Sequence, residues 1–266
     1  MLLRLEQIRK VFNEGSSDEK VALNDINLSL DTGDFVTVIG SNGAGKSTLM
    51  NMIAGVQLPD VGTISINGEN VTQQPEYKRS TLIGRVFQDP MAGTAPSMTI
   101  EENLALAYAR NKKRTLRMGA SKKRRDFFRQ SLAALHLGLE DRLHAKAGLL
   151  SGGERQALSL LMATFTEPSI LLLDEHTAAL DPSRAALITT LTKEMVESKQ
   201  LTTLMVTHNM QQALKLGNRL LMMDKGNIIF EVKEAEKKEL TIEKLLEAFQ
   251  TIKGEQLTND RALLTI

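Results

Sequence analysis

The chain has 266 residues, of which 42% are hydrophobic and 24% are charged, and its formal net charge is +1. This length can bury a substantial core, either as one large domain or as one domain with a subdomain. The near-neutral charge gives no argument for nucleic acid or an anionic membrane as the main partner. The chain has no cysteine, which excludes disulfides and thiolate metal sites and fits a reducing compartment.

Neither export nor membrane insertion is indicated. Charged residues come as early as Arg4 and Glu6, too soon for the apolar core of a secretory signal. No apolar run approaches the roughly 18–20 residues that cross a bilayer. The longest runs, 169–173 and 201–206, are typical of buried strands. If the protein serves transport, another chain must form the pore.

Alternating apolar and polar residues at 3–8 and 21–30 predict antiparallel strands. An apolar strand at 35–39 leads into a glycine-rich loop, and a helix is expected at 46–54. Strands at 63–66 and 83–87 follow.

The pattern changes at Thr99, where Thr99-Ile100-Glu101-Glu102 is a capping box that opens a helix. A second helix is expected around 126–137. The segment from about 90 to 165 is therefore expected to be a largely helical subdomain, inserted between sheet-forming regions.

Strands and helices then alternate, which predicts a parallel sheet covered by helices; the segments are 169–174, 183–198, 202–207 and 209–216. Segments 220–223 and 228–232 predict a closing hairpin. Residues 1–232 are expected to form one α/β domain. Residues 233–266 would be a short tail, with one amphipathic helix from Leu240 and a loose end.

The glycine-rich loop matches the phosphate-binding pattern G-x-x-x-x-G-K-[ST]. Its residues are Gly40-Ser41-Asn42-Gly43-Ala44-Gly45-Lys46-Ser47-Thr48. Glycines allow the backbone N–H groups to approach phosphate oxygens, and the following helix presents its positive end. Lys46 would neutralise the β- and γ-phosphates, Ser47 would bind Mg²⁺, and Thr48 would reach the α-phosphate. The pattern therefore predicts a site for the phosphates of a nucleotide; the alternative is an ordinary glycine-rich turn, which the preceding strand and following helix disfavour.

Two acids end the apolar strand Ile170-Leu171-Leu172-Leu173-Asp174-Glu175. Asp174 would hold Mg²⁺ through water, and Glu175 would polarise the water that attacks the γ-phosphate. The alternative is a strand that merely ends in solvated acids, which the phosphate loop upstream makes less attractive.

A third motif, Leu150-Ser151-Gly152-Gly153-Glu154-Arg155-Gln156, opens a helix and resembles a second phosphate site. With the other motifs, in this order, it makes residues 3–232 similar to an ATP-binding cassette (ABC) ATPase. That resemblance implies a P-loop α/β core with an antiparallel β layer and an inserted α-helical subdomain. It also implies a homodimer around two ATP, in which Ser151 and Gly153 reach the ATP of the partner subunit.

The resemblance assigns further roles, each with an alternative. Gln88 matches the glutamine loop that contacts Mg²⁺ or the attacking water, but alone it is only a polar residue after a strand. Asp181 matches the loop that crosses the dimer interface. His208 matches the histidine that contacts the γ-phosphate, or it simply neighbours a helix cap. Phe12 stands where an aromatic ring stacks on adenine, although it also suits core packing.

Two positions depart from the family's common pattern. Glu154 replaces a frequent Gln, and we expect it to orient the helix without touching phosphate. His176 replaces a Pro that usually follows Glu175. It is either a tolerated replacement or a residue that tunes Glu175 or the dimer interface.

The run Gln88-Asp89-Pro90-Met91-Ala92-Gly93-Thr94-Ala95-Pro96, with the segment from Asp174 to Asp181, is similar to bacterial tryptophan/tyrosine-type uptake ATPases. That group implies a membrane permease and a substrate-binding lipoprotein as partners. It also implies a cytoplasmic position, peripheral on the inner face of the membrane. The substrate and the direction of transport do not follow from these residues.

The stretch 110–129 holds ten Lys or Arg and one acid. It is a solvated face, a contact with anionic lipid headgroups, or a nucleic-acid contact. Sparse aromatics, with only Phe127 and Phe128 nearby, argue against nucleic acid. The main alternative to a transport motor is a soluble ABC ATPase that acts on ribosomes or DNA. One cassette and no heptad run favour transport.

Overall fold

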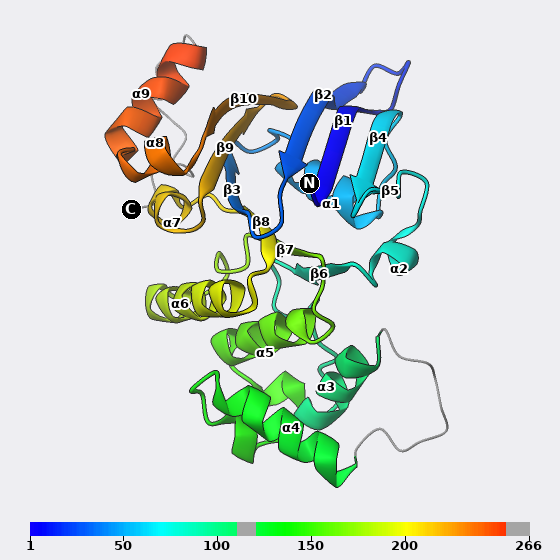
Figure 1. Ribbon diagram of the computed structural model, residues 1–266, viewed down its shortest axis with the longest axis vertical. Helices are drawn as coiled ribbons and strands as arrows, with labels where there is room; N and C mark the ends of the chain where they lie inside the picture. Colours follow the sequence, from blue (N-terminus) through cyan, green and yellow to red (C-terminus); the bar gives the residue numbers. More distant parts are fainter. Residues whose placement is uncertain (111–120, 254–266) are drawn as a thin grey trace. The chain divides into compact units, whose positions relative to one another are not determined.

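The computed structural model describes residues 1–110 and 121–253. The chain divides into two compact units, Met1–Ser80 with Gln200–Ile266, and Thr81–Lys199. We call these the first unit and the second unit; Figure 1 labels their elements. Within the described ranges, no helix combines the length and apolar character that a bilayer crossing requires.

An antiparallel sheet belongs to the first unit, with its strands in the order β2-β1-β4-β5. The strands are β1 (Leu3–Phe12), β2 (Lys20–Leu30), β4 (Val61–Ile66) and β5 (Glu69–Asn70). Burial roughly alternates along β1 and β2, because one face of such a sheet packs on a core while the other meets solvent. The predicted antiparallel pairing is confirmed.

Four further strands of the first unit lie in the order β10-β9-β3-β8. They are β3 (Phe35–Gly40), β8 (Thr202–Val206), β9 (Arg219–Asp224) and β10 (Asn227–Val232). β3 pairs in parallel with β8 and β9, and β10 closes a hairpin on β9. Every residue of β3 and β8 is buried, as expected for parallel strands covered on both faces. The predicted parallel strands and closing hairpin are confirmed.

The helices of the first unit are α1 (Lys46–Ala54), α2 (Glu76–Arg79), α7 (Met210–Lys215), α8 (Glu234–Lys238) and α9 (Ile242–Lys253). Figure 1 shows α8 and α9, in orange and red, beside α7 and β9. Leu245 and Phe249 of α9 are buried against Ile39, Met222 and Val232. α8 was not predicted from the sequence, and α9 is part of the core. The expected loose end, 254–266, lies outside the described residues.

The second unit contains two parallel strands, β6 (Ile83–Val86) and β7 (Ile170–Asp174). Helices α3 (Ile100–Ala109), α4 (Lys122–Ala133) and α5 (Gly152–Thr164) lie between them in the sequence, and α6 (Pro182–Lys199) follows the second strand. The 3-10 turns are η1 (Leu139–Asp141) and η2 (Ala147–Leu149). The predicted capping box at Thr99 is confirmed at the start of α3.

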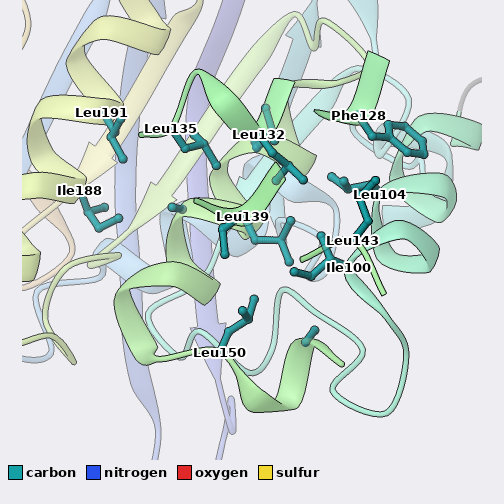
Figure 2. Close-up of a cluster of buried hydrophobic side chains, with 14 residues drawn as sticks. Ile100, Leu104, Phe128, Leu132, Leu135, Leu139, Leu143, Leu150, Ile188 and Leu191 are labelled. Carbon is teal, nitrogen blue, oxygen red and sulfur yellow. The ribbon is translucent and has the colours of Figure 1, made fainter. Parts of the chain in front are cut away.

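A hydrophobic cluster joins the helices of this unit. Figure 2 shows Phe128 and Leu132 of α4 close to Leu104 of α3, with Leu139 and Leu143 beside them. α4 begins and ends earlier than the predicted 126–137, because Ser121 caps its first turn. His136 follows with a left-handed φ of 55°, which ends the helical path.

Candidate nucleotide site

Glycines shape the phosphate loop between β3 and α1. A Cβ atom on Gly40 would lie 2.1 Å from the carbonyl oxygen of Met223, and one on Gly45 would lie 2.5 Å from that of Ala22. Gly45 also has a φ of 100° and is the N-cap of α1. Side chains are therefore excluded at both positions. Asn42, Gly43 and Ser47 are exposed, so the apex of the loop is accessible to an anion from solvent.

Lys46 lies across the loop that precedes it. Its side chain is 6% exposed, and Nζ donates hydrogen bonds to the carbonyl oxygens of Gly40, at 2.8 Å, and Ser41, at 3.0 Å. The Ser41 hydroxyl donates to Oδ1 of Asp224 at 2.8 Å. Asp224 ends β9, which is paired with β3, and so anchors the start of the loop. The sequence analysis missed Asp224; its position at a strand end beside the loop strand was the available signal.

His208 follows β8 at the same sheet edge as the phosphate loop, because Val38 of β3 is in register with Val206 of β8. Its turn is held by neighbours. The Thr207 hydroxyl donates to Oε1 of Gln212 at 2.7 Å, and the Asn209 side chain caps α7. His208 itself is half-buried. The parallel register therefore brings the phosphate loop and His208 together within the first unit.

Phe12 is the last residue of β1 and is half-buried. The ammonium of Lys10 lies 5.7 Å from its ring centroid, a cation–π distance. Its partner in register is Lys20, the first residue of β2. The Nζ atom of Lys20 lies 3.8 Å from the position of a Cβ on Gly43. Phe12 thus lies at the end of β1, beside the start of β2, and the first residue of β2 reaches the apex of the phosphate loop. Lys20 was not singled out from the sequence.

Asp174, Glu175 and Gln88 lie at the carboxyl ends of two neighbouring parallel strands, because Val86 of β6 is in register with Leu173 of β7. Asp174 and Glu175 are half-buried, and Gln88 is exposed. Glu175 has a φ of 44°, in the left-handed region that non-glycine residues rarely occupy. Such backbone strain is found at functional sites.

Asp174 is paired with a residue that the sequence analysis missed. Nη2 of Arg85, on β6, lies 3.1 Å from Oδ2 of Asp174, and the exposed fractions of the two side chains are 13% and 15%. Arg85 lies just before the glutamine-loop match, which begins at Val86, and that nearness was the signal available in the sequence.

Ser151 caps α5. Its hydroxyl accepts from the backbone N–H of Glu154, whose carboxylate accepts in return from the backbone N–H of Ser151 at 2.7 Å. Arg142 also donates to Glu154 at 2.7 Å. Partial burial acts to raise the pKa of Glu154, but the bonds from Ser151 and Arg142 outweigh it and hold the pKa below its ordinary value. Glu154 thus orients the start of the helix, as expected.

The Ser-Gly-Gly turn lies beside the loop that contains Asp181. A Cβ on Gly152 would lie 3.3 Å from Cδ2 of Leu180, and one on Gly153 would lie 3.1 Å from Cδ of Arg184. Asp181 is exposed, and its Oδ1 accepts from the backbone N–H of Arg184 at 3.1 Å. A side chain at either glycine would therefore press on Leu180 or Arg184.

His176 is a neutral core residue. It exposes 1% of its surface, and its Nε2 lies 2.9 Å from the hydroxyl oxygen of Thr192. Burial lowers the pKa of His176 to about 4. The sequence suggested a titratable group beside Glu175, but near neutral pH this residue adds no charge there.

Ten residues of the basic stretch, 111–120, lie outside the described residues. In the remainder, Arg125 pairs with Glu101 at 2.6 Å, and Arg124 lies 5.8 Å from the ring centroid of Tyr108. Phe128 is fully buried, and Phe127 and Phe128 pack with Tyr108 and Phe165. Phe128 therefore belongs to the helical core, while Phe127 is 41% exposed and packs on it from the surface.

The side chains predicted for magnesium are the Ser47 hydroxyl, the Asp174 carboxylate and the Gln88 amide. All offer oxygen, the donor that Mg²⁺ prefers, and Mg²⁺ commonly uses one or two carboxylates with substrate phosphates. No group of three His, Cys, Asp or Glu residues gathers as a metal cluster in residues 1–110 and 121–253. By donor type, each of these three side chains suits Mg²⁺ that arrives with a nucleotide.

Comparison with known proteins gives one family. Residues 23–178 match the family model described as "ABC transporter". A tyrosine transport ATP-binding protein of Clostridioides difficile is 42% identical over 94% of this chain and 99% of its own length. The glycine betaine/carnitine/choline transport ATP-binding protein OpuCA of Bacillus subtilis is 34% identical over 86% of this chain and 57% of its own length.

Two solved structures of ATP-binding cassettes are similar to this chain in fold. The dimeric post-hydrolysis state of the ATP-binding cassette MJ0796, bound to ADP and Pi, superposes with a TM-score of 0.74. It is 28% identical and covers 88% of this chain and 99% of its own. The ADP conformation of the transporter cassette MJ1267 gives a TM-score of 0.75 at 29% identity, covering 93% of this chain and 98% of its own.

Proposed function

Because the chain belongs to the ABC transporter family and is an ATP-hydrolysing cassette, we infer that it drives a bacterial importer of an amino acid or a similar small solute. Its fold is the mixed α/β cassette, with an antiparallel sheet and a helical subdomain. The tyrosine-transport relative supports an aromatic amino acid as the solute.

The nucleotide is held mainly by the first unit. Phe12 stacks on adenine, the loop Gly40–Thr48 wraps the phosphates, and Lys46 moves its charge from the loop carbonyls to the β- and γ-phosphates. Ser47, Asp174 and Gln88 would hold Mg²⁺. The metal supplies charge neutralisation at the phosphates.

Glu175 accepts a proton from the attacking water, and Gln88 and His208 position the water and the γ-phosphate. The register of β6 with β7 supports a joint role for Gln88 and Glu175, because both residues follow the carboxyl ends of these neighbouring parallel strands. The left-handed backbone of Glu175 also supports this role, because strained backbone of this kind is found at functional sites.

The second copy of the chain completes each site. Capping leaves the Ser151 hydroxyl hydrogen free to donate, and the N-terminus of α5 adds the partial positive charge of its dipole. Gly152, Gly153 and Asp181 line the same interface. The dimeric MJ0796 cassette supports this arrangement.

The dimer is proposed to act on a membrane permease, together with a substrate-binding lipoprotein, and to lie on the inner face of the cell membrane. The cassette itself spans 1–232, with the helical subdomain at about 90–165 and the C-terminal segment at 233–266. The relatives named for transport support these partners.

The observation that carries the proposal is the placement of motifs at strand ends: the phosphate loop with His208 in one unit, and Gln88 with Asp174 and Glu175 in the other. The test is affinity capture of tagged Glu175→Gln from detergent-solubilised cells with Mg-ATP. A co-purifying polytopic permease and lipoprotein are expected, and Lys46→Ala should capture less of both. Ribosomal or DNA-bound partners without a membrane protein would favour the soluble ATPase instead.

A further inference from the structure

Arg85 occupies an unusual position between the magnesium carboxylate and the glutamine loop. Its Nη2 lies 3.1 Å from Oδ2 of Asp174, and both side chains are more than four-fifths buried. The guanidinium carbon also lies 4.8 Å from the ring centroid of Phe87, within cation–π range. One cation therefore contacts both Asp174 and the residue just before Gln88.

The contact continues into the helix that begins with Gly152. The carbonyl oxygen of Phe87 accepts a hydrogen bond from Nε2 of Gln156, at 3.1 Å. Gln156 is fully buried in α5. Asp174, Arg85, Phe87 and Gln156 thus form a chain of contacts within the second unit.

The pairing of Arg85 is incomplete. Its Nε–H is buried and has no acceptor among the described residues. Leaving a buried donor unsatisfied destabilises the fold, and a purely structural ion pair would use both edges of the guanidinium fork against the carboxylate. Arg85 thus meets Asp174 through Nη2 while its Nε–H stays unused.

We propose that Arg85 is a positioning residue for the magnesium site: it neutralises Asp174 in the absence of metal and links that carboxylate to the Phe87–Gln88 turn. This inference rests on the proposed function, in which Asp174 holds Mg²⁺. Since Mg²⁺ and the guanidinium are both positive and draw on one carboxylate, each weakens the other's interaction with it. Arg85 would therefore be held less tightly by Asp174 once Mg²⁺ is bound, and the Phe87 ring would pass this change to Gln88.

The first test measures ATP affinity of the full chain with Mg²⁺ and with EDTA, in the wild type, Arg85→Gln and Arg85→Lys. The quantity compared is the affinity for ATP with Mg²⁺ divided by the affinity with EDTA. Arg85→Gln removes the competing charge and should raise this ratio by about threefold to tenfold, the size of one ion-pair coupling. Arg85→Lys keeps the charge and should stay near the wild-type ratio.

A matched control is Arg125→Gln, which breaks the Arg125–Glu101 pair of the same unit and should lower stability without changing the ratio. A ratio that is unaltered in Arg85→Gln would leave Arg85 a structural residue and overturn the inference. If Mg²⁺ fails to strengthen ATP binding in the wild type itself, the magnesium role of Asp174 in the proposed function is what has failed.

The second test follows hydrogen exchange of residues 87–92 in the ATP-bound wild type, Arg85→Gln and Phe87→Leu. Adding Mg²⁺ should change exchange in the wild type, and both variants should lose that metal-dependent change. Phe87→Leu should keep the wild-type affinity ratio, because it leaves Arg85 on Asp174. A metal-dependent change that persists in both variants would exclude Phe87 as the link.

Discussion

Nε2 of His176 lies 2.9 Å from the hydroxyl oxygen of Thr192, in a part of the core that solvent does not reach. The burial that lowers the pKa of His176 to about 4 couples this residue to folding. The unfolded chain binds a proton there near pH 6.5, while the folded chain does not. Stability is therefore lost as pH falls from about 6.5 to about 4.

His176 should account for about 3 kcal/mol of that loss at pH 4. We expect His176→Gln to unfold with a shallower pH dependence over this range, measured by urea denaturation at each pH. His136→Asn, which removes an exposed histidine, should keep the wild-type slope. The pH profile of hydrolysis above pH 6.5 should be the same in His176→Gln and the wild type; a displaced profile would show that His176 does tune Glu175.

Lys46→Ala should weaken ATP binding by about tenfold to a hundredfold, the range for hydrogen bonds to charged groups. The ammonium now held by Gly40 and Ser41 is the only lysine charge inside the loop segment 40–48. Equilibrium binding with a fluorescent ATP analogue measures the effect, and the exposed Lys193→Ala is the control. Unchanged binding would overturn the phosphate-loop assignment.

Glu175→Gln should bind ATP normally and hydrolyse it about 10²–10⁴ times more slowly, the usual contribution of a general base. Glutamine keeps the shape of the side chain but accepts no proton. The ATP-bound variant should accumulate as a dimer in size-exclusion chromatography. Turnover near the wild-type rate would remove Glu175 from the role of base.

Ser151→Arg should block dimer formation and leave ATP binding intact, because the bulky cation would stand at the proposed interface. The variant also loses the cap of α5, at a cost of about 1 kcal/mol. Ser121→Arg is the matched control, since Ser121 caps α4 in the same way. If both variants dimerise in the Glu175→Gln background, Ser151 does not face the partner's ATP.

Phe249→Ala should destabilise the protein by about 3–5 kcal/mol, as expected for a fully buried aromatic ring. Phe249 packs α9 on the core of the first unit. The exposed Glu247→Ala on the same helix should have little effect. Equal thermal unfolding of the two variants would mean that α9 contributes nothing to stability in solution.

Much of the local structure followed from the sequence because its signals lie within a few residues. The helix predicted at 46–54 matches α1 at both ends, since Gly45 and Gly55 both adopt left-handed φ. The capping box at Thr99 is equally local. The order of the motifs also identified the cassette family and its fold, because each short pattern carries its own phosphate or metal chemistry.

Tertiary structure alone decided what depends on distant residues. Arg85 and Asp174 are 89 positions apart and meet only because β6 and β7 are parallel neighbours. The neutrality of His176 comes from burial, which no local pattern reports. Likewise α8 and α9 pack on β9 and α7 through contacts that the amphipathic pattern of the tail could not specify. Chemistry carried by contiguous residues can be predicted from a sequence, whereas burial and long-range pairing arise only when the chain folds.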